Sequence, residues 1–242
     1  MKALTITGIG PGDPSLLTLA ALDAIKESTV VSYPVSRKGG ESFAAKIASK
    51  WITSDKKKLP LYFPMVFDQE TLKASWRNAG NELMLMVDKG EKVIFIAQGD
   101  ISHFSTGSYL YMELERNYPE CVVKLIPGIT SFSAAAAKAK LPLVMQEEQL
   151  LILPVPESSF ELKTILVQAA EKRRIVVLLK VGNKWIWVKP LLQELELLEN
   201  SIFAENVGLL DEQIARASDL SLSSKPYFSL LVIRQTWPLL RP

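Results

Sequence analysis

The sequence predicts an α/β protein of two α/β domains, and two observations carry this prediction. Short apolar runs alternate with segments whose apolar residues recur every three or four positions, as expected for buried strands and amphipathic helices. The 242 residues are also enough for two domains of modest size. We place the domains at residues 1–143 and 144–242, because prolines and a change of character occur between Lys140 and Gln149.

Five strands and five helices are expected in the first domain. The run at residues 93–97 is apolar throughout, as in a parallel sheet that is covered on both faces. Strands are expected near residues 5–7, 30–33, 58–63, 93–97 and 122–126. The helices have apolar residues three or four positions apart, and Thr18 is expected to cap the first of them. They are expected near residues 19–25, 43–51, 72–86, 109–114 and 131–137.

Individual helices carry more detailed expectations. Leu19, Leu22 and Ile25 are expected to share one face of the first helix. The spacing of Phe43, Ile47 and Trp51 predicts a core face in the second. The second strand is expected to end before Pro34, and the alanines after Ser133 need a close neighbour because they bury little area by themselves.

The second domain repeats the alternation of strands and helices. Strands are expected near residues 149–153, 175–179, 201–205 and 227–233. Helices are expected near residues 160–170 and 189–198, the latter with Pro190 in its first turn, where the missing N–H costs nothing.

Composition excludes several classes of protein. With 48% hydrophobic and 22% charged residues the chain is typical of soluble proteins, and a net charge of +2 gives no reason to expect nucleic acid. No apolar run approaches the roughly 18 residues of a membrane helix, and no leader is apparent, so we expect no membrane partner and a cytoplasmic location. A single cysteine and a single histidine exclude an ordinary Cys/His zinc site, and we expect no metal.

The stretch TITGIGPGDP at residues 5–14 joins the first strand to a loop of glycines and prolines. Glycines give the backbone freedom and let a ligand approach the main chain, so the loop predicts a pocket at the strand's end. A dinucleotide fingerprint begins with the same Gly8 and Gly10, but its third glycine would fall at Asp13. A nucleotide-dependent oxidoreductase and a purely structural turn are the alternatives at this point.

Two further loops follow predicted strands. QGDISHFSTG at residues 98–107 follows the strand at 93–97, and PGITSFS at residues 127–133 follows the strand at 122–126. Ligands in open α/β sheets bind at this edge. His103 is a candidate proton acceptor or a structural hydrogen-bonding group, and Asp100 is the other titratable candidate, expected to accept hydrogen bonds that shape the loop. Thr130 could alternatively only cap the alanine helix.

These three loops resemble the tetrapyrrole (corrin/porphyrin) methyltransferases, as do LLTLA at residues 16–20, EQLLILP at 148–154 and LKVG at 179–182. The resemblance implies S-adenosylmethionine bound in a cleft between two α/β domains, methyl transfer to a reduced tetrapyrrole, and a homodimer. The family commonly has proline where this chain has Ile101. A non-catalytic protein on the same scaffold is therefore an alternative.

The resemblance also implies which residues bind. For the cofactor these are main-chain groups and small side chains of the loops, with two positions in the second domain: Gly10, Pro11, Gly99, Asp100, Ile101, Ser105, Thr106, Thr130, Ser131, Val181 and Asn206. The family's substrate is a polycarboxylate, which arginine and lysine can pair. The candidates are Arg37, Lys38, Lys180 and Lys184, with solvated surface cations as the alternative.

Overall fold

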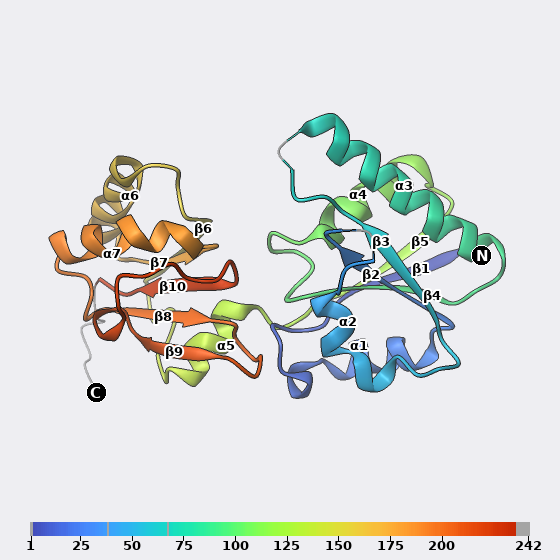
Figure 1. Cartoon of the computed structure of the whole chain (residues 1–242), viewed down its shortest axis with the longest axis horizontal. Helices are drawn as coiled ribbons and strands as arrows, with labels where there is room; N and C mark the ends of the chain where they lie inside the picture. The colour runs from blue at the N-terminus through green and yellow to red at the C-terminus, as the bar shows by residue number, and fades with distance from the viewer. Residues whose placement is uncertain (1, 38, 67, 236–242) are drawn as a thin grey trace. The chain divides into compact units, whose positions relative to one another are not determined.

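The computed structural model describes residues 2–37, 39–66 and 68–235 (Figure 1). The chain forms two compact units, Met1–Thr130 and Ser131–Pro242, and each contains a five-stranded sheet with helices. The predicted two-domain α/β fold is therefore confirmed. The contacts of the structure divide the chain after Thr130. We had placed the domain boundary from a change in the sequence that lies after residue 140.

The sheet of the first unit is parallel throughout, with strand order β3-β2-β4-β1-β5. Its strands are β1 (Ala3–Gly8), β2 (Val30–Val35), β3 (Lys57–Tyr62), β4 (Val93–Ala97) and β5 (Val122–Ile126). The prediction that β2 ends before Pro34 was wrong. Pairing between β2 and β4 stops at Ser32, so Pro34 has a partner strand on one side only, where a missing N–H is tolerated.

Helices cover both faces of this sheet (Figure 1). They are α1 (Leu19–Glu27), α2 (Phe43–Ile47), α3 (Gln69–Asp88) and α4 (Thr106–Asn117). One cluster joins α1 and α2 to Ile94 and Ile96 of β4, and another joins α3 and α4 to Val93 and Phe95. Successive side chains of β4 point to opposite faces of the sheet, so this strand contributes to the hydrophobic core on each face.

The cap predicted for α1 is confirmed, but two predicted helix faces were partly wrong. Thr18 Oγ1 accepts a hydrogen bond from Ala21 N at 3.1 Å. Leu19, the first residue of α1, is 78% exposed, because the buried face runs through Ala21 and Ile25. Phe43 is 45% exposed, because the buried face of α2 runs through Ala44 and Ile47. Trp51 lies beyond the end of α2, in a 3-10 turn.

The second unit has a mixed sheet with strand order β6-β7-β10-β8-β9, in which only β6 and β7 are parallel neighbours. Its strands are β6 (Gln149–Pro154), β7 (Arg174–Leu179), β8 (Ser201–Glu205), β9 (Gln213–Arg216) and β10 (Ser229–Ile233). The short edge strand β9 was not predicted. Its QIAR sequence alternates weakly, and burial along it is only partial.

The described part of the second unit contains three helices: α5 (Ser131–Lys138), α6 (Ser159–Glu171) and α7 (Trp185–Glu194). Ala134, Ala135 and Ala136 of α5 are buried, as their small size requires of a helix that packs against β10, whereas Ala137 is exposed. The predicted start of α7 near Pro190 was wrong. The helix follows a 3-10 turn, Gly182–Lys184, and Trp185 anchors its first turn by burial and by an indole hydrogen bond to Ser221 O at 3.0 Å.

A buried ion pair ties the segment before β6 to the end of β10. Both oxygens of Glu148 accept hydrogen bonds from Arg234 Nη2, at 2.6 and 2.7 Å, and the two side chains are 0% and 1% exposed. Arg234 Nη1 also donates to Pro142 O at 3.0 Å and to Leu143 O at 3.2 Å. The guanidinium therefore fixes the segment that leads into the second sheet.

Within the described residues, no helix combines the length and apolarity that spanning a bilayer requires. The remaining short helical turns are 3-10 turns at Pro14–Leu16, Ser49–Trp51 and Ala217–Asp219.

Candidate functional site

A switch in chain direction lies at the carboxyl ends of β1 and β4. These strands are neighbours, yet β1 leads to α1 on one face of the sheet and β4 leads to α4 on the other. The loops after them therefore diverge. Such a switch point is where open α/β sheets bind ligands.

Main-chain hydrogen bonds lock the first two loops together. Gly10 N donates to Gly99 O at 3.1 Å, and Gly99 N donates to Gly10 O at 2.7 Å, which forms an isolated bridge beyond the ends of the strands. Gln98 Nε2 adds a hydrogen bond to Pro11 O at 2.7 Å. The two sequence motifs are thus one structural unit, and Gln98 is a member that the sequence did not single out.

Glycine is required where the third loop joins them. A Cβ on Gly8 would lie 2.5 Å from Gly99 O and 2.8 Å from Gly128 N. A Cβ on Gly128 would lie 2.2 Å from Gly99 O. Real Cβ atoms do not come so close to backbone, so Gly8 and Gly128 serve the packing of the three loops against one another.

Gly99 has a different environment. Its φ of +74° belongs to the left-handed region that favours glycine, and no described atom beyond Gly99 and its two chain neighbours lies within 4 Å of the position that a Cβ would occupy. Its main chain therefore borders open space at the switch point. This is the geometry expected where a ligand approaches the backbone closely.

Asp100 connects the second loop to the third. Its Oδ2 accepts from Gly128 N at 2.8 Å, and its Oδ1 accepts from Ser102 N at 2.9 Å and from the Ser102 hydroxyl. His103 Nδ1 lies 2.9 Å from the same Oδ1. Burial opposes ionisation of the carboxyl, but these hydrogen bonds outweigh it and lower the pKa of Asp100 to about 2.

The rest of the second loop is held by the start of α4. Ser105 Oγ accepts from Gly107 N at 3.1 Å as the helix cap, and the Ser108 hydroxyl donates to Ile101 O. Ile101 and Ser105 are both buried, whereas Thr106 is partly exposed as the first residue of the helix. The contacts of α4 thus fix this loop even though it lacks the family's usual proline.

The third loop contains the last two candidates of this group. Thr130 and Ser131 are both partly exposed, and they lie where the two units divide, with Ser131 as the first residue of α5.

In the second unit, Val181 and Asn206 lie at the same end of the sheet. Val181 N donates to Ser229 O at 3.1 Å, and Asn206 N donates to Phe228 O at 2.9 Å, so both flank the start of β10. Asn206 has a φ of +51°, and its Nδ2 donates to Asp211 Oδ2 at 2.7 Å. The structure brings these two candidates together within their own unit.

The candidate substrate-binding cations have different surroundings. Arg37 and Lys180 are exposed, and the Lys180 ammonium lies 6.0 Å from the centroid of the Tyr227 ring. Lys184 Nζ donates to Val155 O at 2.9 Å, to Pro156 O at 3.1 Å and to Glu157 Oε1 at 2.8 Å. That arrangement favours a structural role for Lys184. Lys38 lies outside the described residues.

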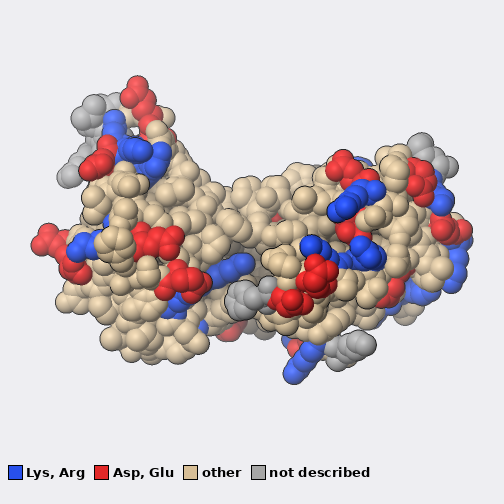
Figure 2. All heavy atoms as spheres, turned by 90° about the horizontal axis from the view of Figure 1, so that it is seen from above, with Lys and Arg blue, Asp and Glu red and all other residues tan. Residues whose placement is uncertain are grey.

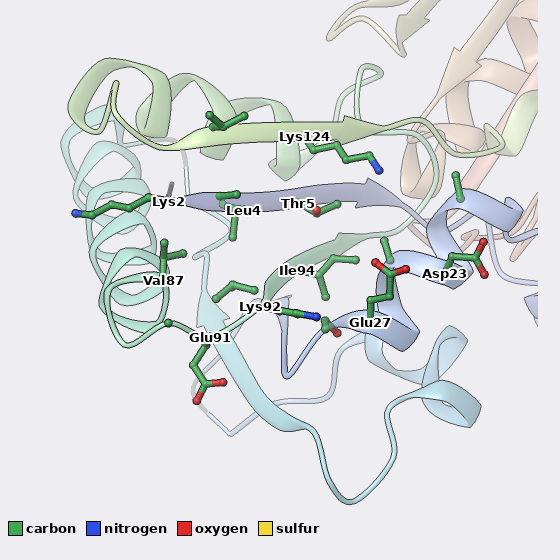
Figure 3. Close-up of a pocket in the computed structure, with 17 residues that line it drawn as sticks. Lys2, Leu4, Thr5, Asp23, Glu27, Val87, Glu91, Lys92, Ile94 and Lys124 are labelled. Atoms are coloured by element: carbon green, nitrogen blue, oxygen red, sulfur yellow. The ribbon is translucent and has the colours of Figure 1, made fainter.

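A cavity of about 900 Å³ lies elsewhere in the first unit (Figure 3). Its wall includes Thr5 of β1, Ile94 of β4 and Lys124 of β5, together with Asp23 and Glu27 of α1. Thr5 and Ile94 belong to the first halves of their strands and Lys124 is the middle residue of β5, so the cavity is displaced from the carboxyl ends where the loops meet. We therefore do not place the cofactor in it.

On the surface shown in Figure 2, the described basic and acidic side chains are interspersed. This mixture agrees with the small net charge of the sequence.

The fold and the site define an α/β protein with a candidate ligand-binding site at a switch point, and comparison with known proteins identifies its family. Residues 3–220 match the family described as Tetrapyrrole (Corrin/Porphyrin) Methylases. The chain belongs to this family of methyltransferases, which use S-adenosylmethionine, as the sequence motifs had indicated.

Three relatives illustrate the similarity. Cobalt-precorrin-2 C(20)-methyltransferase of Salmonella typhimurium is 30% identical over 230 residues, which are 94% of each chain. Precorrin-2 C(20)-methyltransferase of a Sinorhizobium species is 26% identical, over 93% of this chain and 92% of that one. A solved uroporphyrin-III C-methyl transferase of Thermus thermophilus, complexed with S-adenyl homocysteine, has a TM-score of 0.61 at 22% identity and covers 95% of this chain and 96% of its own. That structure supports the fold.

Gly99→Ala is expected to weaken binding of S-adenosylmethionine at least tenfold, because the added methyl group enters the open space beside the main chain. Gly90→Ala is the matched control, since Gly90 has a φ of +80° and equally open surroundings but lies in the turn before β4. Both variants should lose about 1 kcal/mol of stability from backbone strain. Calorimetric titration measures affinity, and equal affinity in the two variants would contradict the placement of the site.

Proposed function

We propose that this chain methylates precorrin-2, or its cobalt complex, at C-20 with S-adenosylmethionine as donor, a step of cobalamin biosynthesis. The observation that carries the proposal is similarity over 94% of both chains to a relative whose name states this reaction on the cobalt complex. A second relative, named for the metal-free substrate, is similar over almost its full length. Methylation of another ring position by the same fold is the alternative.

The donor is proposed to bind at the switch point of the first unit. The open space beside Gly99 fits a ligand that approaches the main chain. Pro11 and Ile101 of the bridged loops are proposed to contribute main-chain groups, and their carbonyls also accept hydrogen bonds from Gln98 and Ser108. Small polar side chains at Ser105, Thr106, Thr130 and Ser131 complete this candidate set. Val181 and Asn206 are proposed as the second unit's contribution.

Little covalent chemistry is required of the protein in this reaction. The sulfonium of the donor supplies an electrophilic methyl group, and the tetrapyrrole supplies an electron-rich carbon. The residues of the site align the two and exclude water, and good alignment can contribute on the order of 7–11 kcal/mol. The rigid arrangement of Gly8, Gly99 and Gly128 is suited to that task, because bridged loops vary little in position.

We propose that carboxylates of the substrate pair with Arg37, Lys38 and Lys180. Lys184 is a weaker candidate, because its ammonium already has three partners.

Arg37→Ala is expected to raise the Michaelis constant for the tetrapyrrole about tenfold and to leave the Michaelis constant for the donor unchanged, since a lost ion pair acts in the ground and transition states alike. Arg116→Ala, at the far end of α4, is the control for loss of an exposed arginine. Equal effects of the two substitutions in steady-state kinetics would assign Arg37 to the solvated surface.

We also propose that the protein is a cytoplasmic homodimer that binds neither nucleic acid nor membrane. Sedimentation equilibrium at micromolar concentration checks the assembly, and a monomer mass would contradict it.

Methyl transfer tests the function directly. Purified protein is incubated with methyl-labelled S-adenosylmethionine and either precorrin-2 or its cobalt complex, and NMR of the product locates the label. We expect one methyl group on C-20 and one equivalent of S-adenosylhomocysteine. The ratio of kcat/KM for the two substrates decides which form is used. Label at another ring carbon would overturn C-20 as the position of methylation. Saturable binding of the donor without methyl transfer would indicate a different class of substrate.

A further inference from the structure

Asp100 and His103 form a pair in which the carboxylate is buried and the imidazole is accessible. The Asp100 side chain is 6% exposed and that of His103 is 43% exposed, with 2.9 Å between Oδ1 and Nδ1. The backbone on both sides of the pair is tightly turned, because Gly99 and Phe104 have φ values of +74° and +52°. The loop therefore holds the imidazole at the switch point described above.

The contact determines which imidazole nitrogen carries the proton. Asp100 is ionised near neutral pH and can only accept hydrogen bonds. The Ser102 hydroxyl, 3.0 Å from Nδ1, donates to the same Asp100 oxygen, so Nδ1 is the donor toward Oδ1. In neutral His103 the Nε2 atom then has the lone pair and is the basic nitrogen. A buried carboxylate that orients an imidazole in this way makes its outer nitrogen a proton acceptor.

We propose that His103 Nε2 is the general base of the methylation and that Asp100 is its positioning residue. The inference rests on the proposed function. When the substrate carbon forms its bond to the methyl group, the S–CH₃ electron pair remains on sulfur and gives a neutral thioether. The ring carbon then carries both its hydrogen and the new methyl group, and the ring is cationic. Transfer of that proton to Nε2 returns the C–H electrons to the ring, and the imidazolium later releases the proton to water.

The single histidine of the chain makes the tautomer directly measurable. With ¹⁵N-labelled protein, long-range ¹H–¹⁵N correlation spectra should show one imidazole, whose neutral form has a protonated Nδ1 and an unprotonated Nε2. In Asp100→Asn the preference for this tautomer should be lost, because the amide at position 100 can also donate. A protonated Nε2 in the unaltered protein would overturn the proposal without any measurement of activity.

Kinetics separates a base from a structural hydrogen-bonding group. His103→Asn retains an N–H donor for Asp100 but has no basic nitrogen, so kcat should fall about 100-fold or more while the KM values and donor affinity change little. His103→Ala should regain part of its activity when imidazole is added. A His103→Asn variant within threefold of the unaltered protein would overturn the base and leave the proposed function intact. Absence of transfer by the unaltered protein would instead overturn the proposed substrate, and this inference with it.

Discussion

Glu148→Leu is expected to destabilise the second unit by about 3–5 kcal/mol, because it leaves the buried guanidinium of Arg234 without its counter-ion. The double variant Glu148→Leu/Arg234→Met should recover most of this loss, since a buried pair exchanged for apolar groups is often close to neutral. Recovery is expected to be incomplete, because Pro142 O and Leu143 O lose the hydrogen bonds that Arg234 supplies.

Urea unfolding followed by circular dichroism measures these differences. Glu194→Leu is the control, because Glu194 pairs with Lys163 on the surface and such pairs contribute about 0–1 kcal/mol. If Glu148→Leu and Glu194→Leu cost the same, the buried pair does not fix the segment before β6. If the double variant is no more stable than Glu148→Leu, the loss does not come from an unpaired charge.

Gly128→Ala is expected to destabilise the first unit by about 3 kcal/mol and to abolish measurable binding of S-adenosylmethionine. Its Cβ would lie 2.2 Å from Gly99 O, so the three loops must separate, and overpacking of this kind costs about 1–3 kcal/mol even where side chains can adjust. Backbone atoms adjust less than side chains.

Gly80→Ala provides the comparison for this substitution. Gly80 lies inside α3, and the nearest atom to its Cβ position is 3.6 Å away, so alanine fits there and should stabilise the helix by roughly 0.5–1 kcal/mol. Thermal unfolding and donor titration are measured on both variants. A stable, donor-binding Gly128→Ala protein would mean that the loops do not pack as described.

The sequence predicted the strands that are short apolar runs between turn residues, and it missed β9, whose QIAR sequence is not such a run. The run at 93–97 became β4 with those bounds, and the run at 122–126 became β5. Helix limits were harder to predict where two local signals competed. Pro190 is compatible with a first turn, yet burial of Trp185 starts α7 earlier, and such tertiary contacts are not visible in local propensity.

The candidate site was predicted from loops that follow strands, and the structure joins those loops as a parallel sheet requires. The sequence could not assign individual roles within them. Gly8 and Gly99 look alike in a glycine motif, but one packs against backbone and the other borders open space. Lys184 and Arg37 are both basic residues, and the sequence does not distinguish their roles. Only the fold shows that Lys184 Nζ donates to Val155 O, Pro156 O and Glu157 Oε1.

The central position of β1 determines when the first unit can be completed during synthesis. The strand is synthesised before both of its neighbours, β4 and β5, so Leu4 pairs with Val93 and Val123. One edge of β1 has no native partner until residues 93–97 have been made, and the other has none until residues 122–126 have been made. Such non-local pairing slows folding and exposes strands that can associate wrongly. A nascent chain that ends before residue 122 thus leaves one edge of β1 unpaired, whereas both edges are paired in the finished unit.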